Sequence, residues 1–225
     1  TRGTSKRIYS NSVSADESHT DRVTAFNSDG FSLGGPSLVN TNTYNYAAWQ
    51  WKANGGTTAT NSDGSTDATV QANTDAGFSI VTFTTDGGNE TYGHGLGVKP
   101  DIVIVKSRSG GGSWIYMTDV IDGSVDYLLL NGTNAAADLS YGAFTSSTFQ
   151  YNDNNAVTQI AYCFSEKQGY SKFGKYVGNG NADGTFVYTG FKPAFLMIKA
   201  ATTAGQNWLV QDSKRPAYNP TSGRL

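Results

Sequence analysis

The side chains that most often carry chemistry are few and scattered in this sequence. There are two histidines, His19 and His94, and they are far apart, the first in a polar stretch and the second in a Gly-His-Gly-Leu-Gly loop. No motif places a nucleophile or an orienting carboxylate beside either one. We interpret His94 as a structural residue whose imidazole caps backbone groups in a tight turn. No catalytic residue and no enzymatic activity are predicted; a polysaccharide depolymerase would need paired carboxylates in a cleft, and no such pair is recognisable.

Cys163 is the single cysteine, so neither a disulfide within the chain nor a thiolate metal cluster is expected. It lies between Tyr162 and Phe164 in an apolar segment, with no base or cation adjacent in sequence. A buried and inert thiol is therefore predicted.

Three clusters of Asn, Asp and Gly supply oxygen atoms that could bind calcium, at residues 86–90, 152–155 and 181–184. None has the spacing of a defined calcium loop. The same residue types are those that hairpin turns require, so we interpret the clusters as turns. The sequence thus predicts no metal site and no cofactor.

Three tyrosines fall in polar loops and could stack against a sugar ring: Tyr141, Tyr151 and Tyr170. Most other aromatic residues fit core positions. These three are the candidate ligand-binding residues for an alternative function, a receptor- or glycan-binding module.

The composition excludes some classes of partner. Only 15% of the residues are charged and the net charge is −2, so there is no basic field to attract nucleic acid. No apolar run is long enough to cross a membrane, and no signal peptide opens the chain. With 27 Gly, 5 Pro and many Ser, Thr and Asn between apolar runs, the chain favours strands joined by tight turns.

The elements that must position these residues follow from an internal repeat. Residues 97–106 and 190–199 each read Gly-apolar-Lys-Pro, one variable residue, four apolar residues and Lys, with no gap in the alignment. Four successive apolar positions predict a short strand buried on both faces. Each proline fits the first residue of its strand, and the bracketing lysines are expected to keep the ends in water. Lys52, Lys99, Lys192 and Lys199 are interpreted as flanking charges.

A second repeat relates residues 25–31 to 143–149, and residues 47–51 to 160–164. In the latter pair, aromatic residues alternate with smaller ones, which predicts half-buried strands. Further strands are predicted at residues 78–83, 114–116 and 127–130. Residues 176–177 and 186–188 are predicted to flank a turn.

The repeats predict an all-β protein of tandem antiparallel β-sandwich-like modules. Residues 1–53 form the second half of a module, 54–75 a linker or long loop, 76–166 a complete module and 167–225 the first half of another. A half-module exposes a strand edge and half a core. The terminal halves therefore close on each other within one chain, complement halves of neighbouring subunits, or belong to a longer array.

Several motifs occur together in order: residues 25–34, 77–83, 93–97, 161–166 and 169–174. Together they resemble an uncharacterised tandem-repeat β domain of marine bacteriophage structural, tail-fibre-like proteins. The resemblance implies a structural repeat protein of a phage virion appendage or extracellular fibre, self-assembling through its half-modules. The expected location is the virion or the extracellular space, which fits a single cysteine if the protein assembles in the cytoplasm before release. The expected partners are further copies, other virion proteins and a host-surface glycan, with no nucleic acid and no membrane insertion.

Overall fold

The computed structural model describes residues 3–35, 38–54 and 56–213, and these residues form strands, turns and loops without a helix. The prediction of an all-β fold is confirmed, and the strands pair antiparallel throughout. Within the described residues no helix is long and apolar enough to cross a membrane. In chain order the strands are β1 (Lys6–Arg7), β2 (Glu17–Ser18), β3 (Val23–Phe26), β4 (Phe31–Leu33), β5 (Ala59–Asn61), β6 (Ala68–Asn73), β7 (Phe78–Thr84), β8 (Glu90–Gly93), β9 (Ile102–Ser107), β10 (Ile115–Thr118), β11 (Asp126–Leu129), β12 (Ala137–Asp138), β13 (Thr148–Tyr151), β14 (Thr158–Phe164), β15 (Phe195–Ile198) and β16 (Leu209–Asp212).

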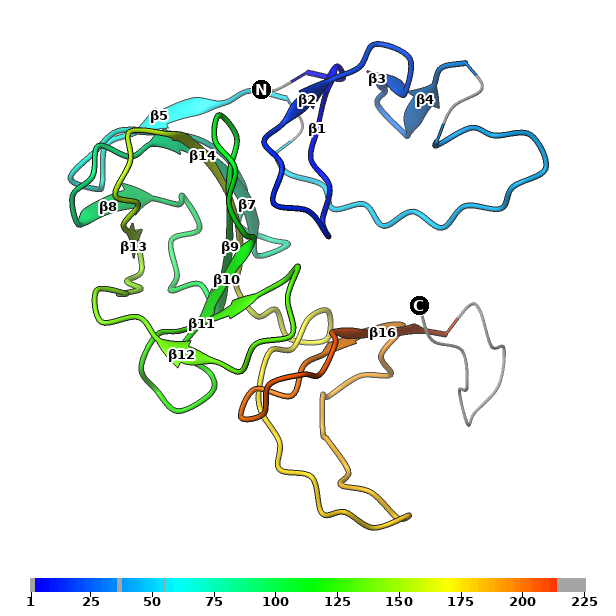
Figure 1. Cartoon of the computed structure of the whole chain (residues 1–225), viewed down its shortest axis with the longest axis vertical. Helices are drawn as coiled ribbons and strands as arrows, with labels where there is room; N and C mark the ends of the chain where they lie inside the picture. Colours follow the sequence, from blue (N-terminus) through cyan, green and yellow to red (C-terminus); the bar gives the residue numbers. More distant parts are fainter. Residues whose placement is uncertain (1–2, 36–37, 55, 214–225) are drawn as a thin grey trace.

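The centre of the molecule is an 8-stranded sheet in the order β12-β11-β10-β9-β14-β7-β6-β5 (Figure 1). β9 and β14 lie in its middle, where β14 pairs with β9 on one side and β7 on the other. The Lys-Pro strand of the first repeat is therefore a central strand, and Val103 and Val105 are fully buried in it.

The two-stranded sheet of β8 and β13 forms a second layer over one face of the large sheet. Phe83 of β7 meets Tyr92 of β8 with ring centroids 3.9 Å apart, and Phe149 of β13 packs against both rings. Tyr92 and Phe149 are fully buried. This packing of two sheets around one apolar core is β-sandwich-like.

The prediction that the lysines keep the ends of the Lys-Pro strand in water is wrong for Lys106. Its side chain is fully buried, and its ammonium donates hydrogen bonds to the carbonyl oxygens of Val13 (3.2 Å) and Gly112 (2.9 Å). Burial lowers the pKa of Lys106. Lys99 is exposed, as expected, and pairs with Asp119.

Residues 54–75 differ from the predicted linker or long loop. They contain β5 and β6, which complete one edge of the large sheet. Ala68 and Val70 alternate with polar residues along β6 and are buried in the core. Successive side chains of a strand point to opposite faces of the sheet, so Ala68 and Val70 can face the core while the polar residue between them faces away from it.

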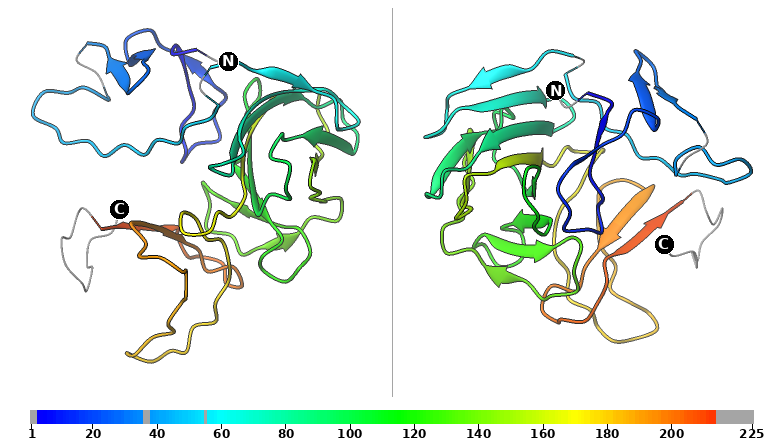
Figure 2. Two further views of the ribbon diagram at one scale, coloured as in Figure 1. Left: turned by 180° about the vertical axis from the view of Figure 1, so that it is seen from behind. Right: turned by 45° about the horizontal axis from the view of Figure 1, so that its top comes forward.

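The terminal segments project from the central module on the same side, one from each end of it (Figure 2). The N-terminal segment carries the hairpins β1-β2 and β3-β4, and the C-terminal segment carries the hairpin β15-β16. Two predictions are wrong here: residues 47–51, and residues 176–177 with 186–188, form no strand in the described structure. Strands at these positions would need a neighbouring strand to pair with.

Candidate assembly surface

The N-terminal segment is attached to the central module through the loop between β9 and β10. Trp114 donates its indole N–H to the carbonyl of Tyr9 at 2.7 Å. Two backbone bonds lie beside it, from Asp16 N to Arg108 O (3.0 Å) and from Gly112 N to Val13 O (2.8 Å). The Arg108 guanidinium also pairs with the Asp16 carboxylate at 3.2 Å. We call this contact the first junction.

The C-terminal segment is attached by a second junction of the same design. Trp208 donates its indole N–H to the carbonyl of Leu129 at 2.9 Å. The backbone bonds run from Ala136 N to Ala201 O (2.7 Å) and from Gly205 N to Thr133 O (2.8 Å). Each of these atoms corresponds to one in the first junction. The β1-β2 hairpin matches β11-β12 with a shift of 120 residues, and the β9-β10 loop matches the β15-β16 loop with a shift of 93 residues that becomes 94 at Trp208.

The strands on either side of the junctions repeat as well, down to their pairing register. Lys6 pairs with Ser18 in β1-β2, as Asp126 pairs with Asp138 in β11-β12. Leu209 pairs with Ile198 in β15-β16, as Ile115 pairs with Val105 in β9-β10. The terminal segments therefore have the local structure of the central module, although each of them matches only one half of it.

The β3-β4 hairpin repeats a turn of the central module. The backbone bond from Asn27 N to Gly30 O is 2.8 Å, and its counterpart from Thr145 N to Thr148 O is also 2.8 Å. Their surroundings differ, because Phe149 is fully buried whereas its counterpart Phe31 is 38% exposed. The repeat conserves the turn within the chain but not the layer that covers it.

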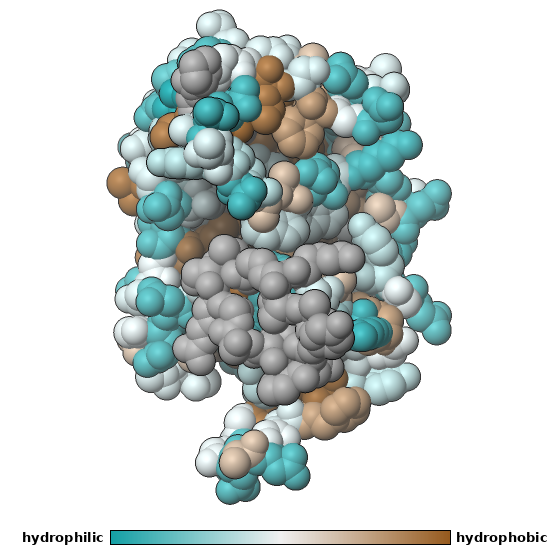
Figure 3. Space-filling model, turned by 90° about the vertical axis from the view of Figure 1, so that its right-hand side faces the viewer, coloured by the Kyte–Doolittle hydropathy of each residue, from teal (hydrophilic) through white to brown (hydrophobic). Residues whose placement is uncertain are grey.

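Most of the exposed large apolar side chains lie in the two terminal segments. The described examples in the N-terminal segment are Val13, Phe26, Phe31, Leu33, Leu38, Tyr44, Tyr46, Trp49 and Trp51, and in the C-terminal segment Tyr176, Val177, Phe186, Val187, Tyr188, Phe195 and Leu196. Figure 3 views the side from which these segments project, and hydrophobic residues gather there towards the top and again near the bottom. Exposed apolar surface on this scale is uncommon on a folded domain, so we expect a further segment or a partner to cover it. We call these residues the terminal apolar surface.

An aromatic contact joins the two terminal segments. The rings of Trp49 and Phe195 lie 5.9 Å apart, edge to face. By the sequence repeat, Trp49 corresponds to Tyr162 of β14 and Phe195 to Ile102 of β9, and β14 and β9 are paired in the central module. In the described residues β15 pairs only with β16, so the position of a β14-like strand beside it is open.

The comparison with protein families matches residues 1–225 to one family, described as a domain of unknown function (DUF7483). The match spans the whole sequence. The chain belongs to this family. No curated protein and no solved structure matches it. Within this DUF7483 chain, the repeated junctions are therefore the most informative guide to the role of the fold.

The three tyrosines that were predicted as candidate ligand-binding residues lie in different environments and do not form one site. Tyr151 is buried in the core of the central module, where its ring offers no face to a sugar. Tyr141 is half-buried, and its hydroxyl donates to the carbonyl of Asn152 at 3.5 Å. Tyr170 is 59% exposed and lies beside a pocket lined by Glu166, Gln168, Gly169, Ser171, Lys172, Tyr188, Thr189 and Gly190.

His94 and Cys163, for which the sequence predicts structural roles, are both buried. His94 is fully buried, and its Nδ1 accepts a hydrogen bond from the backbone N–H of Leu96 at 3.1 Å, which confirms the predicted capping of a turn. Cys163 is fully buried in β14, and burial raises the pKa of its thiol to about 12. An unreactive thiol follows from that shift.

Sequence reasoning missed the junctions, and the reason is physical. Apart from the two tryptophans, the junction contacts are made largely by backbone atoms, which any residue supplies. The β1-β2 and β11-β12 hairpins share little side-chain chemistry, so their correspondence is visible only in the pairing register. The equivalence of Trp114 and Trp208 was the one available signal.

Proposed function

We propose that this protein is a non-catalytic structural building block of a phage virion appendage or extracellular fibre, whose two terminal segments combine into a second β module. The observation that carries the proposal is that three hydrogen bonds of the first junction recur in the second, two between backbone atoms and one from a tryptophan indole. Repeat proteins stack like modules so that each contacts only its neighbours, and a junction that recurs between modules is the contact that such stacking requires. The virion or fibre setting is supported by the sequence resemblance.

The central module supplies the template for completing the second one. There, β14 pairs with β9 so that Tyr162 lies opposite Ile104 and Phe164 opposite Ile102. In the second module, residues 47–51 would take the place of β14 against the open edge of β15. The hairpin β3-β4 would then cover the apolar face of β15, as β13 covers the core of the central module.

We assign the completing segment to the same chain. Both terminal segments project on one side, and Trp49 already contacts Phe195. Two segments tethered to one module meet at a high effective concentration, so pairing within the chain is favoured over pairing between chains wherever the geometry permits it. Exchange of the same segments between copies would be domain swapping and would build oligomers, closed if the exchange is reciprocal and open-ended if it runs head to tail.

An engineered disulfide tests the assignment. Cys163 lies directly opposite Val103 in the β14-β9 pair, and the corresponding residues of the second module are Gln50 and Leu196. Opposite residues of an antiparallel pair are about 5 Å apart at Cα, within reach of a disulfide. The variant carries Gln50→Cys, Leu196→Cys and Cys163→Ala.

We expect a disulfide within one chain, seen as a faster-migrating monomer on a non-reducing gel. The control replaces Leu196→Cys by Lys199→Cys, which is off register and should not cross-link. Cross-links between chains would overturn closure within the chain in favour of domain swapping. If the Gln50→Cys, Leu196→Cys variant folds but forms a cross-link neither within one chain nor between chains, the second module is overturned and with it the structural proposal.

Glycan recognition is the second candidate function, and the pocket beside Tyr170 is the observation that favours it. Its lining combines an exposed aromatic ring, Tyr188, with the polar side chains of Glu166, Gln168 and Lys172. Aromatic stacking and polar contacts of this kind suit a saccharide. Saccharide binding that is lost in Tyr188→Ala and Tyr170→Ala would favour this function over a purely structural one.

A further inference from the structure

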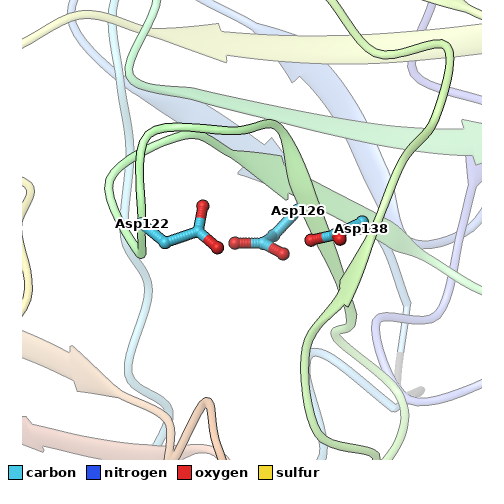
Figure 4. A group of neighbouring side chains, drawn as sticks. All are labelled: Asp122, Asp126 and Asp138. Carbon is cyan, nitrogen blue, oxygen red and sulfur yellow. The ribbon is translucent and has the colours of Figure 1, made fainter.

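Three aspartates meet at one end of the β11-β12 hairpin, which carries the second junction. Asp126 begins β11 and lies directly opposite Asp138, the last residue of β12. Asp122 comes from the turn before β11. One carboxylate oxygen from each residue lies within 4.8 Å of the others. Figure 4 shows the Asp126 carboxylate between those of Asp122 and Asp138.

Asp126 is unusual in being buried without a full set of partners. It is only 4% exposed, and its Oδ2 atom has no hydrogen-bond partner. A buried carboxylate oxygen that lacks a partner is costly, so such atoms call for an explanation. The atom belongs to the carboxylate at the centre of the acidic group.

Within the described residues, no lysine or arginine forms an ion pair with the group. The ion pairs found there involve none of the three aspartates. Asp122 accepts hydrogen bonds from the backbone N–H (2.9 Å) and the hydroxyl (2.7 Å) of Ser124, which hold it in place. Lys175, the lysine whose charge acts on Asp122, donates its hydrogen bond to the carbonyl of Ile121 at 2.6 Å.

The other copy of the hairpin shows that the fold does not require these acids. Lys6 and Ser18 occupy the positions of Asp126 and Asp138 in β1-β2, with the same pairing. Like charges directly opposite each other in a strand pair are destabilising. Acidic residues at these positions therefore need a reason other than the hairpin itself.

We propose that Asp122, Asp126 and Asp138 form a calcium site. Carboxylate oxygens are hard ligands that suit calcium, while zinc prefers the nitrogen and sulfur ligands that are lacking here. Two of the three residues are exposed, so water can complete the irregular coordination that calcium accepts and magnesium disfavours. The ion would brace the hairpin that donates Leu129, Thr133 and Ala136 to the second junction.

Calcium titration of the full chain tests the proposal, by isothermal titration calorimetry and by thermal unfolding in CaCl2 against KCl of equal ionic strength. We expect one calcium ion per chain and a rise in melting temperature, because a ligand that binds only the folded state stabilises it. The Asp126→Asn and Asp138→Ser variants, the latter copying Ser18, should bind calcium at least about ten-fold more weakly. Asp183→Asn, in an exposed turn, is the control and should bind like the parent.

Three results would overturn the site. The first is the absence of calorimetric binding to the parent chain at about 10 mM calcium, well above the affinity range of extracellular calcium modules. The second is an unchanged calcium response in Asp126→Asn, and the third an equal response to MgCl2. Calorimetry on the parent chain decides the first and third points even if a variant does not fold.

Discussion

His94 is buried just after β8, and both of its ring nitrogens have backbone partners. Nδ1 accepts from Leu96 N, so Nε2 carries the proton and donates to the carbonyl of Thr145 at 3.3 Å. Burial lowers the pKa of His94, since a charged imidazolium would lose its hydration. The neutral ring is thus a structural part of the turn that leads into β9.

The lowered pKa of His94 makes stability depend on pH in a defined direction. Above about pH 6.5 the imidazole is neutral in both the folded and unfolded states, so its contribution is complete. As the pH falls below that value, the unfolded chain takes up a proton that the folded chain resists, and stability is lost.

We expect the free energy of unfolding, measured by urea titration, to fall between pH 7 and pH 5 and to fall less in His94→Gln. The control is His19→Gln, which replaces the other histidine at a partly exposed position and leaves His94 in place. An equal effect of both substitutions, or none for His94→Gln, would contradict the assignment.

Lys106 shows the same influence of burial on a basic residue. Its ammonium is held by two carbonyl oxygens, one of them from the N-terminal segment. The sequence pattern predicts that Lys106 lies in water at the end of its strand, but the structure makes it part of the first junction. The Gly112 carbonyl is local, whereas the Val13 carbonyl comes from a distant part of the chain that the sequence pattern does not reveal.

At the scale of elements, the two junctions use one tryptophan each in the same role. Trp114 and Trp208 come directly before β10 and β16, and each indole N–H reaches a carbonyl of the neighbouring hairpin. Because the pairing register is the same on both sides, the equivalence is structural and not a coincidence of composition.

Substitution of either tryptophan by phenylalanine tests that equivalence. Trp114→Phe and Trp208→Phe each remove one hydrogen bond and leave a carbonyl without its donor, so each should lower the free energy of unfolding by about 1 kcal/mol. The loss should be larger for Trp114, which is more deeply buried. Chemical denaturation measures both.

The matched control is Tyr44→Phe, which removes a polar group from an exposed aromatic residue and should change stability little. If Trp208→Phe left the free energy of unfolding as little changed as Tyr44→Phe does, the second junction would not contribute to the stability of the fold.

At the scale of the whole molecule, most of the large apolar side chains that remain exposed to solvent belong to the terminal apolar surface. Phe186 is 86% exposed in a single chain, and it faces solvent with most of the large apolar side chains of both terminal segments. Completion of the second module would bury many of them. Where the completing segment comes from decides the state of the protein in solution.

Closure within the chain predicts a mass in solution that stays that of one chain at all concentrations. Sedimentation or light scattering across a concentration series measures it. Growth into oligomers that shorten when an isolated peptide of residues 172–225 is added would contradict closure and indicate exchange between copies. The parent without added peptide is the control.

Much of the fold follows from local patterns. The apolar run at residues 102–105 indicates a buried strand, because this feature depends on neighbours in sequence. The Asn/Asp/Gly clusters at residues 86–90 and 152–155 do not form hairpins, because the strands that they connect pair with other strands. Residues 47–51 have the alternation of a strand but lie unpaired. A strand exists only where a second one supplies its hydrogen bonds, so their pattern alone could not decide it.

The sequence by itself determined the all-β class, the repeat of the Lys-Pro strand and the structural role of His94, since each rests on local spacing and residue type. The tertiary structure decided the junctions, the burial of Lys106 and the meeting of Asp122, Asp126 and Asp138. Their atoms come from separate segments, and the backbone groups that join them carry no side-chain signature. Only the folded chain brings such atoms within hydrogen-bonding or ion-binding distance.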